Sequence, residues 1–177
     1  MSRSKGLLFA LVMVLFLLEG TVLKWIIPSV WQGNVAVSTH FTLVVIMFIG
    51  LYYNRHLSLF YGLGFGLLHD IVYYGPTMIG AYSFSMGVIG YVCGLASSRS
   101  RPNILFSMFI ITMGNFLFEG ILYSLYRLFQ VTKDTPQWMF FHIMLPSVLI
   151  NLLFALLIYV PLRKWLEDMV SQKPKED

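Results

Sequence analysis

Charged residues are scarce in this chain of 177 residues, since Asp, Glu, Lys and Arg together make up only 11%. Hydrophobic residues make up 58%. A soluble domain needs a polar surface around its core, so this composition excludes an ordinary soluble protein. It indicates an all-α integral membrane protein. The stretch with soluble composition, residues 171–177, is too short to fold, and we expect it to be a polar cytoplasmic tail.

Cysteine is nearly absent as well, because Cys93 is the only one and lies inside an apolar run. A single thiol excludes an intrachain disulfide and a metal site built on cysteines. The four histidines do not form HExxH or a similarly tight ligand spacing, and no Ser or Cys nucleophile stands in a recognisable turn motif. The sequence therefore predicts no enzyme activity, no metal and no cofactor.

Basic residues outnumber acidic ones, with a formal net charge of +4, but they form no continuous basic run. Scattered basic residues are not typical of a nucleic-acid-binding surface, so we expect no nucleic-acid partner. The charges lie instead in short gaps between apolar runs. This pattern is typical of loops between membrane-spanning helices.

About six apolar runs follow one another, separated by polar or Pro/Gly-containing gaps. A spanning helix needs about 20 mostly apolar residues, and most of the runs approach this length. The run 40–53 is short, which suits a tilted or half-buried span. We expect a single helical domain over residues 1–170 with spans at 6–27, 40–53, 57–74, 78–96, 103–126 and 138–162.

The distribution of Lys and Arg predicts the orientation. With the N-terminus in the cytoplasm, only Lys24, Arg127 and Lys133 of the 12 Lys and Arg residues fall on the outer side, and the other nine fall on the inner side. Cytoplasmic loops of membrane proteins carry the excess of positive charge. We therefore expect both termini to be cytoplasmic.

Three acids lie inside apolar runs at a similar depth, in the outer half of the first, third and fifth spans: Glu19, Asp70 and Glu119. A carboxylate at the bilayer centre costs about 2.5–3.5 kcal/mol on insertion scales, so these side chains should face the protein interior. Other polar residues at a compatible depth are candidate partners. The expected buried polar, partner-binding or pocket residues are Glu19, His69, Asp70, Asn115, Glu119 and His142.

Two interpretations of this polar cluster stay open: a hydrogen-bond network that fixes helix register, and a site for a partner helix or a small ligand. The histidine spacing disfavours a catalytic or metal centre. A short sequence echo also links two of the acids, because Phe16–Gly20 reads FLLEG and Phe116–Gly120 reads FLFEG. The echo suggests a similar placement for Glu19 and Glu119.

Small residues form stripes in the third and fourth spans. Gly62 and Gly66 share one helical face with Asp70, since the three are spaced by four residues. In the fourth span, small residues repeat every three or four positions, which permits close approach of two backbones. The predicted helix-packing residues are Gly62, Gly66, Gly80, Gly87, Gly90 and Gly94. They either pack the third span on the fourth or present a smooth face to a helix of another protein.

Short motifs between Gly66 and Gly94 and in the last span resemble the rod shape-determining protein MreD family. In the third and fourth spans these motifs are Gly66–Asp70, the break with Gly75, Met78–Ala81 and Gly90–Tyr91. The final span is also similar, at Leu145–Pro146, Leu149–Asn151 and Val160–Arg163. Length and charge pattern fit the family across the whole chain.

The resemblance implies a multi-pass, non-enzymatic subunit of the bacterial elongation machinery in the cytoplasmic membrane. Members of that family partner MreC and act with RodA, a class B penicillin-binding protein and, indirectly, MreB in lateral peptidoglycan synthesis and cell shape. The implied fold is similar to that of the substrate-binding S components of energy-coupling-factor transporters. A small-molecule transporter subunit is therefore the alternative. Against it, the first span lacks the small-residue docking pattern, since Ala10 is followed four residues later by Val14.

Overall fold

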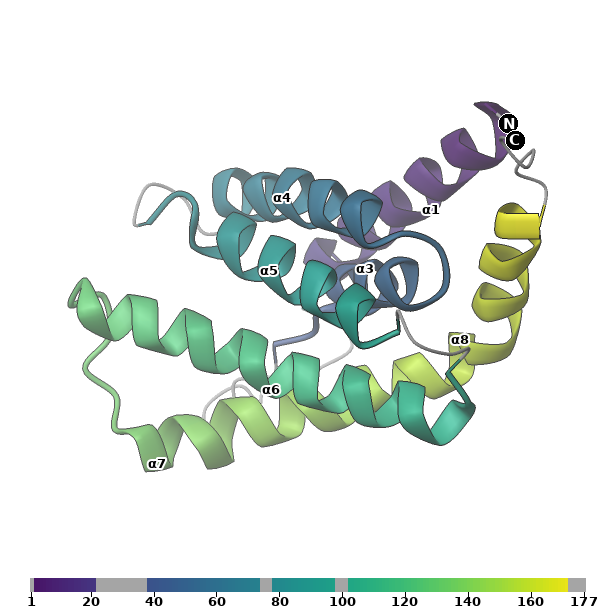
Figure 1. Ribbon diagram of the computed structural model, residues 1–177. Coiled ribbons are helices and arrows are strands. Elements are labelled where there is room, and N and C mark those ends of the chain that lie inside the picture. Colours follow the sequence, from purple (N-terminus) through teal and green to yellow (C-terminus); the bar gives the residue numbers. More distant parts are fainter. Residues whose placement is uncertain (1, 22–37, 74–77, 98–101, 172–177) are drawn as a thin grey trace.

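The computed structural model describes residues 2–21, 38–73, 78–97 and 102–171, and these form helices and their connections (Figure 1). The prediction of an all-helical protein is confirmed for this part of the chain. A π-helical stretch, Phe140–Met144, joins the last two helices into one rod. The helices are α1 (Ser2–Thr21), α3 (Phe41–Tyr52), α4 (Arg55–Val72), α5 (Ala81–Ala96), α6 (Ile104–Leu128), α7 (Pro136–Met139) and α8 (Leu145–Ser171).

Two of the described rods are long and apolar enough to cross a membrane: Ile104–Leu128, with 25 residues, and Pro136–Ser171, with 36 residues. The helices α3 and α5 are apolar but shorter. The helix α8 continues to Ser171, past the expected end at residue 162. Of the expected first span, residues 22–27 lie outside the described part of the chain.

The short helix α3 forms the centre of the molecule. All its residues from Thr42 to Tyr52 are buried, and it contacts α1, α4, α5, α6 and α8. A helix that is apolar on every side is stable where it is surrounded by other helices. The packing therefore explains why 12 residues suffice here, because α3 does not have to cover the apolar width of a bilayer by itself.

Polar side chains at the helix starts satisfy free backbone N–H groups. Asn54 accepts hydrogen bonds from the amides of His56 and Leu57 at the start of α4, and Asn103 accepts one from Phe106 at the start of α6. Such N-terminal caps each contribute about 1 kcal/mol. They define where α4 and α6 begin.

The exterior is apolar and the interior contains the polar groups. Leu105, Leu157 and Phe60 are 78%, 72% and 68% exposed, whereas Asp70 and His40 are 0% and 1% exposed. In water this arrangement would leave large apolar patches uncovered. It is the arrangement expected where lipid surrounds a helical protein, since polar side chains then turn inward.

Two prolines shape the last rod. Pro146 lies two residues after Met144, the end of the π-helical stretch, and lacks the N–H that a regular helix would use there. Pro161 lies inside α8, which bends in its second half (Figure 1). The bend directs the end of α8 toward the start of α1, so these two segments lie at the same end of the molecule.

Candidate functional site

His40 lies at the centre of a buried polar cluster, directly before the first residue of α3. Its Nε2 atom lies 3.2 Å from Oε1 of Glu119 on α6, within hydrogen-bond distance. Its Nδ1 atom lies 3.5 Å from Oε1 of Glu19 on α1, an ion-pair distance. One imidazole thus stands between two carboxylates that are 100 positions apart in the chain. It joins α1, α3 and α6.

The second oxygen of Glu19 is also engaged. Oε2 accepts hydrogen bonds from the hydroxyl of Thr42 at 2.8 Å and from its backbone N–H at 3.2 Å. Nε2 of His69 on α4 lies 3.8 Å from the same oxygen. Within the described residues, His40 Nδ1 and His69 Nε2 make no hydrogen bond. The carboxylate of Glu19 is therefore fixed by Thr42 and faced by two imidazoles.

An amide chain extends the cluster to α8. The backbone N–H of His40 donates to Oδ1 of Asn151 at 2.9 Å, and Nδ2 of Asn151 donates to Oδ1 of Asn115 at 2.9 Å. Asn115 in turn donates to the carbonyl of Ile111, one turn earlier in α6. Both asparagines are 1% exposed. The start of α3 is thereby connected to both long rods, α6 and α8.

Aromatic rings surround the ionisable groups. The His69 ring stacks on Tyr82 with a centroid distance of 5.6 Å and meets Phe16 edge-on at 4.8 Å. Phe118 packs edge-on against His40 at 4.8 Å. These apolar walls exclude solvent, so a charge here is stable only beside an opposite charge or a hydrogen-bond partner. The geometry lets the acids and the imidazole hold one another in place.

The described residues contain no group of three His, Cys, Asp or Glu side chains arranged to hold a metal ion. The Thr42 hydroxyl that donates to Glu19 is 0% exposed, so it is not open to a substrate from the surface. The chemistry of the cluster is that of a buried ion-pair network connecting five helices: α1, α3, α4, α6 and α8.

Asp70 is buried but lies apart from this cluster. Its two carboxylate oxygens accept hydrogen bonds from three backbone N–H groups at the start of α5, those of Gly80 at 2.9 Å, Tyr82 at 3.1 Å and Ser83 at 3.1 Å. The first N–H groups of a helix lack partners within it, and they carry partial positive charge. Asp70 therefore caps α5 from the neighbouring helix α4.

His142 is also separate from the cluster. It is half-buried in the π-helical stretch, its Nδ1 donates to the carbonyl of Trp138 at 3.0 Å, and its ring stacks on that indole. Of the six expected polar residues, the structure brings Glu19, His69, Asn115 and Glu119 to His40. It places Asp70 and His142 elsewhere.

The glycines of α4 and α5 bring the two helices into backbone contact. A Cβ atom on Gly62 would lie 2.5 Å from the carbonyl oxygen of Met86, and one on Gly66 would lie 2.5 Å from Cα of Ser83. A Cβ on Gly87 would lie 2.9 Å from Cδ2 of Leu63. Contacts this short leave no room for a side chain. The pair is packed as closely as the small-residue spacing predicts.

The remaining glycines differ among themselves. A Cβ on Gly90 would meet Ser58 of α4 and Ile46 of α3, and one on Gly94 would meet Arg55. Gly80, by contrast, has open space around it among the described residues and a φ of +104°, a left-handed conformation that favours glycine. It is a turn residue before α5 and makes no close helix contact.

Sequence reasoning did not assign His40 or Thr42 to the site. A signal was present, because the expected topology puts the start of the second span level with the outer ends of the first and fifth spans. A histidine at the end of a span does not by itself indicate a buried partner, and nothing in the sequence spacing around His40 points to Glu19 or Glu119. Only the packing of α3 between α1 and α6 does so.

The family model of the rod shape-determining protein MreD matches residues 4–169. The chain belongs to the MreD family. A Bacillus subtilis (strain 168) protein named "Rod shape-determining protein MreD" is 24% identical over 136 residues, which cover 77% of each chain. No solved structure shows a significant match to the chain. The sequence resemblance is thus confirmed, and a role in bacterial cell shape is supported.

The MreD match spans the elements that build both regions described above. Glu19 on α1 and Asn151 on α8 lie within residues 4–169, as does the glycine-packed pair of α4 and α5. MreD proteins are membrane proteins, which agrees with the apolar exterior of this chain. The buried polar cluster therefore lies within the part of the chain that the MreD family model matches.

Proposed function

We propose that the protein is a non-enzymatic scaffold subunit of the bacterial rod complex that binds an MreC-like protein and helps to control lateral peptidoglycan synthesis. The observation that carries this proposal is the MreD match over residues 4–169. RodA and a class B penicillin-binding protein are the further membrane partners, and MreB is reached indirectly. The buried cluster around His40 supports a scaffold because it joins five helices into one unit.

The proposed orientation places both termini in the cytoplasm. The start of α1 and the end of α8 lie at the same end of the molecule (Figure 1), which supports an even number of crossings. The charge bias indicates that this end faces the cytoplasm, since nine of the 12 Lys and Arg residues fall on that side of the expected topology. On this orientation the polar cluster lies in the outer half of the membrane. A reporter that works only in the cytoplasm should therefore be active when it is fused after Asp177, and one that works only outside the cytoplasm should be inactive there.

A partner helix has to use the outward surface of the bundle. The glycines of α5 already contact α3 and α4 of the same chain. Outward apolar side chains are available on three elements, for example Leu17 on α1, Leu67 on α4 and Phe109 on α6, which are 54%, 42% and 58% exposed. Helices associate in lipid through side-chain packing at such surfaces.

Photocrosslinking tests the proposal. A photoreactive amino acid replaces Leu17, Leu67 or Phe109, one at a time, in cells that also produce the MreC-like protein. We expect adducts with the membrane helix of that protein from one of these faces, together with co-purification and rescue of rod shape in depleted cells. Rescue of cell shape without any adduct or co-purification would contradict the scaffold. Nutrient accumulation that depends on an ATPase pair would instead favour the transporter alternative.

A further inference from the structure

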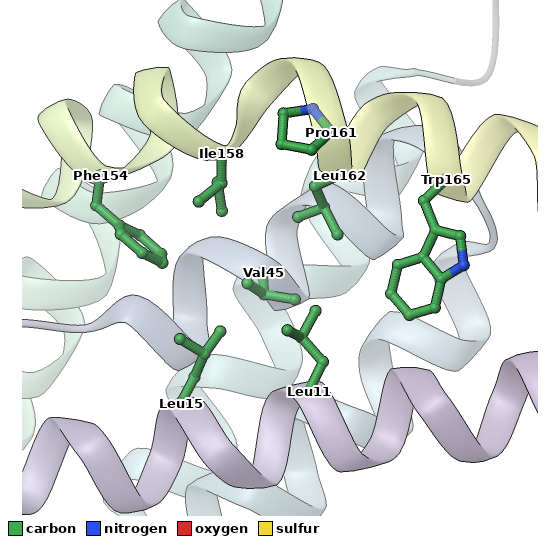
Figure 2. A pocket seen from close by; sticks show the side chains of 8 residues that line it. All are labelled: Leu11, Leu15, Val45, Phe154, Ile158, Pro161, Leu162 and Trp165. Carbon is green, nitrogen blue, oxygen red and sulfur yellow. The ribbon is translucent and has the colours of Figure 1, made fainter.

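An apolar groove separates α1 from α8. Leu11 and Leu15 of α1 form one wall, α8 forms the other wall from Phe154 to Trp165, and Val45 of α3 forms the floor (Figure 2). The cavity has a volume of about 380 Å³. The side chains that line it are apolar apart from the indole N–H of Trp165. Its place in the bundle is distinct from that of the cluster around His40.

The dimensions of the groove decide between a chain and a helix as its occupant. The lining residues of α8 extend over about 16 Å at a rise of 1.5 Å per residue, so the groove is about this long. A helix with its side chains is about 10 Å wide, and a segment of that length would fill roughly 1,250 Å³. The groove therefore does not enclose a helix. An unbranched hydrocarbon chain is much thinner and can lie along it.

The ends of the groove are chemically different. Trp165 lies at the end where α1 begins and α8 finishes, and tryptophan is enriched at the boundary between hydrocarbon and headgroups. Lys5 lies near the start of α1 and Lys164 directly precedes Trp165 in α8, and both are exposed and form no ion pair within the described residues. Of the other charged groups here, Arg163 pairs with Glu167 at 3.0 Å, and Asp168 is exposed. Positive charge therefore remains in excess, which complements a phosphate headgroup.

We propose that the groove between α1 and α8 binds one acyl chain of an anionic glycerophospholipid, with the headgroup beside Lys5 and Lys164. The lipid comes from the leaflet at the ends of α1 and α8, which is the cytoplasmic leaflet on the proposed orientation. The chain fills the space between two helices that do not otherwise close on each other. This site does not depend on the binding of an MreC-like protein.

Native mass spectrometry of the detergent-purified full chain tests the apolar part of the site. We expect the wild type to retain one phospholipid and Ile158→Trp, which fills the groove, to lose it. Leu157→Trp is the matched control, because Leu157 is the residue before Ile158 in α8 and its side chain is 72% exposed on the outer surface. Leu15→Phe, a smaller filling change, covers the case in which Ile158→Trp does not fold. Equal lipid retention by the folded filling variant and by Leu157→Trp would overturn the proposal.

Two further measurements test the headgroup and the occupant. In mixed micelles, the wild type should retain phosphatidylglycerol at least several-fold better than phosphatidylcholine, and Lys5→Gln with Lys164→Gln should remove this preference. Equal retention of both lipids by the wild type would overturn the anionic assignment. A photoreactive amino acid in place of Ile158 should form adducts with lipid. Adducts with a second polypeptide instead would overturn the acyl chain as occupant.

Discussion

The α4–α5 pair and the cluster around His40 both join helices within an apolar protein, but they do so by different means. In the pair, Gly62 and Gly66 let two consecutive helices meet at the backbone. In the cluster, carboxylates of α1 and α6 meet at the His40 imidazole, and Asn151 of α8 accepts from the His40 backbone N–H. Glu119 is 79 positions and Asn151 is 111 positions from His40. The pair joins neighbours in the sequence, and the cluster joins distant segments.

The two regions therefore have different effects: the glycine contacts pack two helices closely, and the polar cluster selects one arrangement of helices. Lipid is as apolar as leucine, so an apolar surface gives little preference for one helix neighbour over another. Glycine contacts add packing but allow a helix to slide by one turn along a repeated stripe. A buried imidazole between two carboxylates allows no such shift, because any displacement leaves a charge without a partner. We infer that the cluster fixes which helices surround α3.

Loss of His40 should have the largest effect. His40→Leu leaves the carboxylates of Glu19 and Glu119 facing each other without the imidazole, which should destabilise the fold by about 3–5 kcal/mol. Thermal unfolding in detergent measures the change. The triple variant with Glu19→Gln and Glu119→Gln should recover part of the loss because it removes the charges. His142→Leu is the control, and wild-type stability of His40→Leu would refute a structural role for the cluster.

A bulkier residue at Gly62 tests the other region and should rank second. A Cβ here would lie 2.5 Å from the carbonyl oxygen of Met86, a backbone atom that cannot turn away. Overpacking of this kind costs about 1–3 kcal/mol, so Gly62→Ala should lower the unfolding temperature clearly. Gly64→Ala is the matched control, since no described atom lies within 4 Å of its Cβ position. Similar unfolding temperatures for the two variants would contradict backbone contact between α4 and α5.

The glycine-packed pair could largely be anticipated from the sequence, and the cluster only in part. Local spacing shows which residues share a face of one helix, so the helix-packing role of Gly62 and Gly66 could be predicted. The inward direction of Glu19 and Glu119 was also accessible, because lipid penalises charge. Their common partner was not, since His40 lies at a span boundary and reaches both acids only through tertiary packing.

The sequence also predicts the depth of a side chain along its helix better than the direction in which the side chain points around the helix axis. Asp70 follows His69, and one residue turns a helix by about 100°, so the two side chains point to different neighbours. His142 was expected near the same depth as the acids. It lies in a π-helical stretch, whose wider turn changes the rotation of the side chains around it. Sequence spacing does not report such a change.

Asp70 sharpens the comparison because it stabilises the α4–α5 pair by polar contacts. Asp70→Leu leaves three N–H groups at the start of α5 without their acceptor and should cost about 2 kcal/mol. Asp70→Asn keeps one acceptor oxygen and should cost about half as much. Hydrogen exchange of the first turn of α5 provides the measurement. Equal exchange rates in the Leu and Asn variants would show that the negative charge, and not the number of acceptors, holds this helix end.

The smallest effect should come from Gly80, where backbone conformation acts without any packing contact. Gly80 has a φ of +104°, so Gly80→Ala forces a side chain into a left-handed conformation and should cost about 1 kcal/mol. Gly80→Asn should cost less, because asparagine tolerates this region better. Unfolding temperatures of the two variants decide the matter. If Gly80→Ala instead costs as much as Gly62→Ala, the turn before α5 is as tightly packed as the helix contact, and the two kinds of glycine are not distinct.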